Sequence, residues 1–106
     1  AIVQTGSSIG QNSFVWGGAI VGHHTVIGND CWIGSGATIG GNSKVDSGSF
    51  VGLGAIIAHE VSIGAGSIIG AGAVVTRNVD AGGVVTPPAS NHHRMKAASF
   101  IKLFPL

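Results

Sequence analysis

The fold is decided by a stretch in which a β-branched aliphatic residue returns every six positions: Ala19-Ile20-Val21-Gly22-His23-His24-Thr25-Val26-Ile27-Gly28. The six-residue step continues in both directions and gives Val or Ile at thirteen consecutive steps, from Val3 to Val75. The residue four places after each of these is small or β-branched. A period of six fits neither an α-helix nor a simple alternating strand. It predicts short strands with the aliphatic residue pointing inward, joined by bends at which Gly or Asn accepts a positive φ.

This pattern resembles the hexapeptide-repeat family, whose fold is a left-handed parallel β-helix. In that family three hexapeptides form one triangular coil, so residues 18 apart stack at the usual strand spacing of about 4.8 Å. The resemblance covers residues 3 to about 79, and the thirteen hexapeptides predict slightly more than four coils. We therefore expect an all-β fold with a left-handed parallel β-helix over residues 1–79 and a closing strand, loop and short helix over residues 80–106.

The six-residue period stops after Asn78. Residues 79–89 have the composition of a turn, a short strand and a proline-ended loop, similar to the segment that closes many hexapeptide acyltransferases. Asn91 is predicted to cap a helix from Arg94 to Phe104, whose apolar side would cover the open end of the β-helix. No such cover precedes Val3, and the chain begins with Ala1 rather than Met, so we expect further residues upstream.

Composition excludes several classes of partner. Only 8% of the residues are charged, the net charge is +1, and no charged run indicates nucleic acid or a membrane surface. No apolar run approaches the roughly 18 residues of a membrane span. Cys31 is the only cysteine, which rules out an intrachain disulfide and favours a reducing, cytoplasmic compartment.

Stacking by 18 also predicts which outward residues share a face. One apolar column contains Phe14, Trp32, Phe50 and Ile68, and a second contains Ile20, Thr38, Ile56 and Val74. The third column is mostly polar: Ser8, Val26, Lys44, Ser62 and Asp80. Two different apolar patches suit a homotrimer, because a threefold ring needs one patch for each neighbour. Members of the family are usually trimers, although local stacking within one β-helix is an alternative use of the aromatic column.

The reactive side chains fall in one corner column, which contains His23, Gly41, His59 and Arg77. Histidine suits proton transfer near neutral pH because its ordinary pKa is about 6.5. The quoted stretch resembles the catalytic coil of sugar acetyltransferases, in which the first of the two adjacent histidines is the general base. The resemblance implies that His23 deprotonates a sugar amine or hydroxyl as it attacks acetyl-CoA. Gly41 follows His23 by one coil in the same column, and we expect its N–H to face the thioester oxygen as that oxygen becomes negative.

Two positions depart from the family's pattern. Relatives often carry an acidic residue beside the base, where this chain has His24, and a histidine nine residues further on, where it has Trp32. His59, followed by Glu60, resembles the catalytic coil of lipid A acyltransferases and is a second candidate base. The resemblance also implies that the pantetheine arm of the cofactor runs along Gly52, Leu53, Gly70 and Ala71. Arg77 or Lys96 would then meet the cofactor phosphates.

Two other functions stay open. The γ-type carbonic anhydrases share this fold and hold a metal with three histidines, but here the position of the third is Gly64, so no metal is expected. The other alternative is a catalytically silent β-helix that belonged to a larger enzyme.

Overall fold

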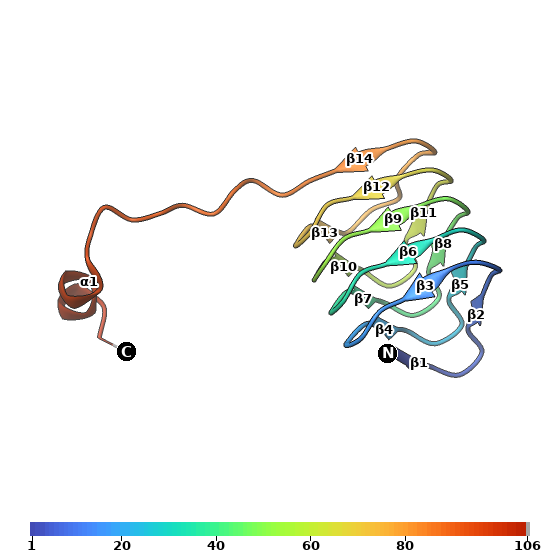
Figure 1. The fold of residues 1–106 in the computed structure, drawn as a ribbon, viewed down its shortest axis with the longest axis horizontal. Coiled ribbons are helices and arrows are strands. Elements are labelled where there is room, and N and C mark those ends of the chain that lie inside the picture. Colours follow the sequence, from blue (N-terminus) through green and yellow to red (C-terminus); the bar gives the residue numbers. More distant parts are fainter. Residues whose placement is uncertain (106) are drawn as a thin grey trace.

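The polypeptide winds into stacked triangular coils whose strands form three parallel sheets (Figure 1). The computed structural model describes residues 1–105. The first sheet contains β1 (Ile2–Val3), β4 (Ile20–Val21), β7 (Thr38–Ile39), β10 (Ile56–Ile57) and β13 (Val74–Val75). The second contains β2 (Ser8–Ile9), β5 (Val26–Ile27), β8 (Lys44–Val45) and β11 (Ser62–Ile63). The third contains β3 (Phe14–Val15), β6 (Trp32–Ile33), β9 (Phe50–Val51), β12 (Ile68–Ile69) and β14 (Val84–Val85).

The 18-residue register predicted from the repeat is confirmed. Ile20 pairs with Thr38, Val26 with Lys44, and Trp32 with Phe50. The inward aliphatic residues from Val21 to Val75 are all buried and form one core between the three sheets. In the first coil the inward Val3 and Ile9 are exposed, because no lower coil covers them within residues 1–105.

The last coil departs from the 18-residue register. Ile63 pairs with Val79 and Ile68 with Val84, so this coil is two residues shorter than the others. The side-chain oxygen of Asn78 accepts the N–H of Ser62 at 2.9 Å, which lets Val79 reach Ile63 early. Asp80 therefore does not continue the outward column of Ser62. The predicted closing strand, β14, completes a fifth coil, so the estimate of slightly more than four was too low.

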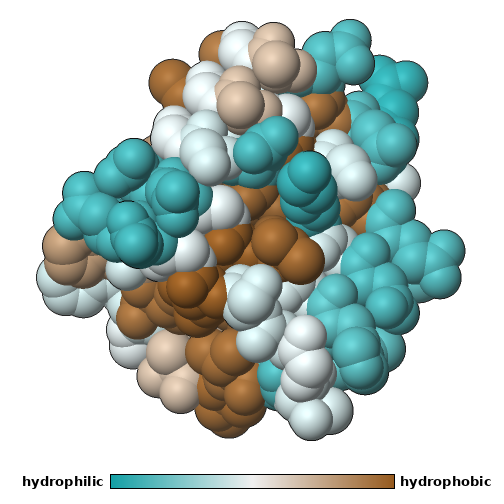
Figure 2. All heavy atoms as spheres, turned by 90° about the vertical axis from the view of Figure 1, so that its right-hand side faces the viewer, coloured by the Kyte–Doolittle hydropathy of each residue, from teal (hydrophilic) through white to brown (hydrophobic). Residues whose placement is uncertain are grey.

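Three corners join the sheets, and we name each by its residues. The histidine corner, between the first and second sheets, contains His23, Gly41 and His59. The aspartate corner, between the second and third sheets, contains Asp30, Asp46 and Asp80. The glycine corner, between the third and first sheets, contains four glycines with positive φ: Gly18, Gly36, Gly54 and Gly72. Figure 2 shows the side away from the C-terminal helix, where hydrophilic groups gather at both margins with apolar atoms between them.

A ladder of hydroxyl groups supports the histidine corner from inside. Thr25 N–H donates to Ser7 Oγ at 3.1 Å, and Ser43 N–H donates to Thr25 Oγ1 at 3.3 Å. Each hydroxyl in turn donates to the carbonyl just before a corner position: Ser7 to Gly22 (2.6 Å), Thr25 to Gly40 (3.0 Å) and Ser43 to Ala58 (3.0 Å). Backbone groups that the sharp turn removes from the sheets are thereby satisfied.

The C-terminal segment is placed differently from the prediction. Residues 86–96 form no helix or strand and run sideways from β14 to α1 (Ala97–Leu103), which stands clear of the β-helix (Figure 1). The N-cap is Lys96 rather than Asn91, and α1 has no buried residue, so it does not cover the open end. Pro87 and Pro88 explain the departure, since proline lacks an N–H and favours extended backbone before it. Within residues 1–105, no helix is long and apolar enough to cross a membrane.

Replacing Thr25 with Val tests the hydroxyl ladder, because the side chain keeps its shape but loses its oxygen. The variant leaves the carbonyl of Gly40 and the N–H of Ser43 without partners, so we expect a loss of about 1–3 kcal/mol in the free energy of unfolding. Amide hydrogen exchange at Ser43 should accelerate in Thr25→Val and stay slow in the control Thr25→Ser. Equal protection of that amide in both variants would contradict the ladder's role.

Candidate active site

The histidine corner stacks His23, Gly41 and His59 in successive coils, as the sequence predicted. The N–H of Asn42 donates to the carbonyl of His23 at 2.8 Å, and the N–H of Glu60 donates to the carbonyl of Gly41 at 2.9 Å. These bonds fix the height of each corner residue relative to the next. Arg77 follows β13 at the same edge, but there the chain enters the shortened last coil.

His23 and His24 form a hydrogen-bonded pair. Their Nδ1 atoms are 3.0 Å apart and their ring planes are 81° apart. The rings lean in opposite directions: His23 lies against Gly41 of the following coil, and His24 lies against Gly6 of the preceding one. His24 reaches this position through a left-handed backbone with φ of 52°. Asn42 and Glu60, which directly follow Gly41 and His59, have similar φ values of 54° and 58°. The turn therefore requires a left-handed backbone at this position in each coil.

The pair determines which nitrogen of His23 is free for chemistry. One Nδ1 must carry hydrogen and the other must accept it, because two lone pairs or two N–H groups would repel. When His23 donates through Nδ1, its Nε2 carries a lone pair and can take a proton from a substrate. His24 thus lies where relatives often carry an acidic residue, and its ring hydrogen-bonds to the ring of His23.

Gln4 is a supporting residue that the sequence analysis did not identify. Its side-chain oxygen accepts the backbone N–H of His23 at 3.0 Å. Stacking by 18 places Gln4 one coil below Gly22, so its position beside the corner was predictable but its side-chain conformation was not.

Packing favours glycine at position 41, where a chemical role is also predicted. A Cβ on this residue would overlap Nε2 and the neighbouring ring carbons of His23. Its N–H donates no hydrogen bond within residues 1–105, so the group remains available to an outside acceptor. His59 is exposed, and its ring forms no hydrogen bond to any residue that the structure describes.

Four of the residues predicted to contact the cofactor lie on a different edge from His23, whereas Gly41 and Arg77 lie on the same edge. Gly52, Leu53, Gly70 and Ala71 belong to the glycine corner, where the N–H of Gly72 donates to the carbonyl of Leu53 at 2.8 Å. The first sheet separates this corner from the histidine corner. A single copy therefore does not bring the two predicted sets of residues together.

An exposed aromatic cluster lies on the outer side of the third sheet. The ring centroids of Trp32 and Phe50 are 6.2 Å apart, and those of Phe14 and Trp32 are 5.8 Å apart. Trp16 joins the cluster with its centroid 5.1 Å from that of Trp32, although it lies outside the predicted column. All four side chains are at least 39% exposed, which leaves a large apolar surface in contact with water.

Comparison with known proteins agrees with the observed coils. The family model for the bacterial transferase hexapeptide (six repeats) matches residues 6–41 and 24–55. The chain belongs to the hexapeptide-repeat family. No curated protein sequence matches it.

Several solved structures resemble this hexapeptide-repeat chain. A mutant of perosamine N-acetyltransferase from Caulobacter crescentus, in complex with CoA and GDP-perosamine, is 33% identical with a TM-score of 0.73 over 74% of this chain and 37% of that one. The acetyltransferase domain of PglB from Neisseria gonorrhoeae, in complex with acetyl coenzyme A, is 26% identical with a TM-score of 0.67 over 78% and 49%. A serine acetyltransferase in complex with cysteine is 28% identical with a TM-score of 0.72 over 90% and 42%. The chain thus spans less than half of each of these three proteins.

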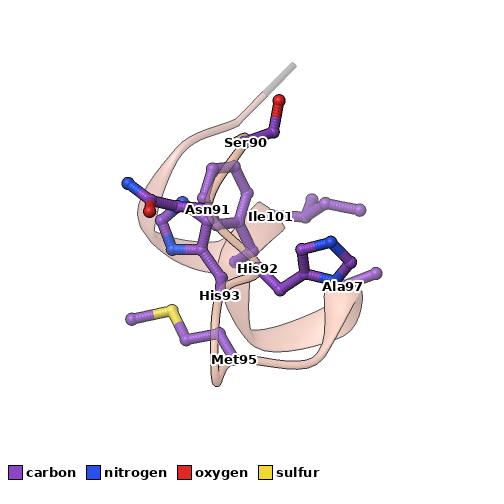
Figure 3. Close-up of a pocket in the computed structure, with 8 residues that line it drawn as sticks. Ser90, Asn91, His92, His93, Met95, Ala97 and Ile101 are labelled. Atoms are coloured by element: carbon purple, nitrogen blue, oxygen red, sulfur yellow. The ribbon is translucent and has the colours of Figure 1, made fainter. Parts of the chain in front are cut away.

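The other two histidines of this hexapeptide-repeat chain, His92 and His93, lie in the C-terminal segment. No cluster of three or more His, Cys, Asp or Glu side chains suited to a metal occurs in residues 1–105. His92 and His93 line a shallow pocket beside α1 (Figure 3), where the rings of His93 and Phe100 are 5.3 Å apart. All the residues that line this pocket belong to the C-terminal segment, and α1 stands apart from the β-helix in Figure 1.

Substituting Gly41 with Ala tests the packing of the histidine pair. The added methyl group must push the ring of His23 aside, so the Nδ1 contact with His24 should break while the fold is retained. We expect the ring nitrogen NMR signals of both histidines to shift. Gly17→Ala is the matched control, because a Cβ there meets no atom within 4 Å. Unchanged ring signals in Gly41→Ala would show that His23 does not lie against Gly41.

Proposed function

We propose that this chain is the β-helix part of an acetyl-CoA-dependent acetyltransferase that modifies an amine or hydroxyl of a nucleotide-linked sugar. The observation that carries the proposal is the His23–His24 pair, which engages Nδ1 of His23 and leaves its Nε2 beside Gly41, free of hydrogen bonds to the described residues. The similar structures support the class of reaction: two are acetyltransferases in complex with CoA or acetyl coenzyme A, and one also holds a nucleotide-linked sugar.

In the proposed reaction, Nε2 of His23 removes a proton from the acceptor nitrogen or oxygen. The acceptor atom bonds to the thioester carbon, and the carbonyl oxygen becomes negative. The C–S bond then breaks, and the proton on His23 passes to the departing thiolate. The products are an acetylated acceptor and CoA with a free thiol. A well-placed base of this kind contributes about 10²- to 10⁴-fold.

His24 acts in this scheme as a positioning residue. It accepts the Nδ1–H of His23, which holds the productive tautomer and stabilises the positive ring formed after proton transfer. The free N–H of Gly41, one coil away, is the proposed donor to the developing oxyanion, a contribution worth about 10²- to 10³-fold.

We propose that the active unit is a homotrimer. The two apolar faces, defined by Phe14, Trp32 and Phe50 and by Ile20, Ile56 and Val74, share the glycine corner as a common edge. A threefold ring that uses both faces gives each copy one apolar contact with each neighbour. The proposed groove lies between two copies and is bordered by the histidine corner of one and the glycine corner of the other.

Such a groove also accounts for the separation of the two predicted sets of residues. Gly52, Leu53, Gly70 and Ala71 of one copy would line the pantetheine path toward His23 of another. Gly52 and Gly70 suit close approach of a ligand because they present backbone without side chains. Arg77 is the proposed phosphate contact at the upper end of the column. We place the reaction in the cytoplasm, where the buried thiol of Cys31 would stay reduced.

Replacing His23 with Asn separates the two candidate bases. We expect kcat to fall by about 10²- to 10⁴-fold in His23→Asn, while acetyl-CoA binding measured by calorimetry remains intact. His59→Asn is the matched control and should stay within a few-fold of the wild-type kcat. The assay supplies acetyl-CoA with GDP-perosamine, with unmodified sugars and with serine as acceptors. Loss of activity in the control alone would move the base to His59.

His24 is tested by two substitutions that tolerate its left-handed backbone. His24→Gly removes the ring without strain, and we expect kcat to fall by about tenfold or more with an unchanged KM for acetyl-CoA. His24→Asn keeps an oxygen close to the position of Nδ1, so it should recover most of kcat. Equal kcat in wild type and His24→Gly would rule out a positioning role.

A further inference from the structure

The two rings of the His23–His24 pair lean toward opposite sides of the histidine corner. The ring of His23 lies against Gly41 of the following coil, whereas the ring of His24 lies against Gly6 of the first coil. A Cβ on Gly6 would overlap the ring of His24, and the φ of 74° at this residue also favours glycine. The first coil therefore has room for the imidazole of His24 only because residue 6 lacks a side chain.

The tautomer of the pair makes Nε2 of His24 a hydrogen-bond donor. When Nδ1 of His23 carries the hydrogen, Nδ1 of His24 accepts it with its lone pair. A neutral imidazole carries one hydrogen, so in His24 that hydrogen is on Nε2. Within residues 1–105 this N–H has no hydrogen-bond partner.

Gln4 supplies further donors on the same side of the corner. Its side-chain oxygen accepts the backbone N–H of His23 at 3.0 Å, which fixes the orientation of the amide, because only the oxygen of an amide accepts. The NH₂ group of Gln4 is thereby directed away from this N–H. Its two hydrogens have no acceptor in the part of the chain that the structure describes, and the side chain is exposed.

Backbone oxygens next to these donors are already used. The carbonyl of Gln4 accepts from Ser7 at 3.3 Å, and the carbonyl of Thr5 accepts from the N–H of His24 at 3.0 Å. The lower side of the corner, toward the first coil, therefore presents neutral N–H donors. Hydroxyl and ring oxygens accept hydrogen bonds from such donors, and a sugar carries both kinds of oxygen close to the group that would be acetylated.

We propose that the NH₂ group of Gln4 and the Nε2–H of His24 bind oxygens of the acceptor sugar. They orient the amine or hydroxyl to be acetylated toward Nε2 of His23. The acceptor then approaches from the first coil, while acetyl-CoA lies beside the coils above. The inference rests on the proposed function for the class of acceptor, and it adds the residues that recognise that acceptor.

Nitrogen NMR tests the contact directly, because the side-chain NH₂ of glutamine gives its own signal. GDP-perosamine, glucosamine and cyclohexylamine are titrated separately into the ¹⁵N-labelled chain without acetyl-CoA. We expect the two sugars to shift the signals of the Gln4 NH₂ and of His24 Nε2. Cyclohexylamine is a ring amine without oxygen and should leave the Gln4 signal unchanged. Gln11, the other glutamine, lies at a different corner of the first coil and serves as an internal control.

Two outcomes of the titration would overturn the proposal. One is a Gln4 signal that stays unchanged with both sugars. The other is a Gln4 signal that responds equally to cyclohexylamine, since the contact would then not depend on sugar oxygens.

Two substitutions separate a sugar contact from support of His23. Gln4→Glu keeps an oxygen for the N–H of His23 but has no NH₂ group, so the Kd for glucosamine should rise about 3- to 10-fold. Gln11→Glu introduces the same charge and should leave that Kd unchanged. Gln4→Met removes both groups, so it should also weaken sugar binding, and it alone should accelerate amide hydrogen exchange at His23.

Weaker sugar binding in Gln4→Met but not in Gln4→Glu would make Gln4 a support for His23 only, and would overturn the proposal. Sugar binding is measured without acetyl-CoA and independently of catalysis. A sugar that binds through Gln4 but is not acetylated would therefore refute the proposed reaction and leave the contact established.

Discussion

The vertical stacking of backbone in 18-residue register is the constraint on which the rest of the structure depends. It requires an inward aliphatic residue in every strand and a sharp turn at every corner. It also stacks residues that are 18 positions apart in the sequence directly above one another. At the histidine corner the hydroxyl ladder of Ser7, Thr25 and Ser43 secures that register. The candidate base, His23, lies on a turn whose backbone is fixed by these internal hydrogen bonds. Its exposed side chain therefore extends from a rigid backbone.

Much of this architecture could be predicted from sequence because it is periodic. The buried series from Val21 to Val75 and the column of His23, Gly41 and His59 follow from counting alone. The Nδ1 contact of His23 with His24 could not be predicted, since it depends on side-chain rotation and on a left-handed backbone at His24. The shortened last coil includes a hydrogen bond that the side chain of Asn78 accepts, and the C-terminal segment begins with two prolines, so periodicity no longer predicts either feature.

The separation of the histidine and glycine corners has a consequence for function. Each is chemically incomplete by itself: one corner has the candidate base and the N–H of Gly41, and the other has the backbone proposed to line the path of the pantetheine arm. An assembly in which the histidine corner of one copy faces the glycine corner of its neighbour would bring the candidate base and the proposed cofactor path together. Exposed aromatic residues on the third sheet supply a reason for such assembly, because their burial removes a large apolar area from water.

Calorimetric titration of acetyl-CoA into the purified chain, with the mass of the same sample measured by sedimentation, tests whether acetyl-CoA binds in a groove between copies. We expect a trimer that binds one acetyl-CoA per subunit. A folded trimer that binds none, or a monomer that binds with full affinity, would contradict it.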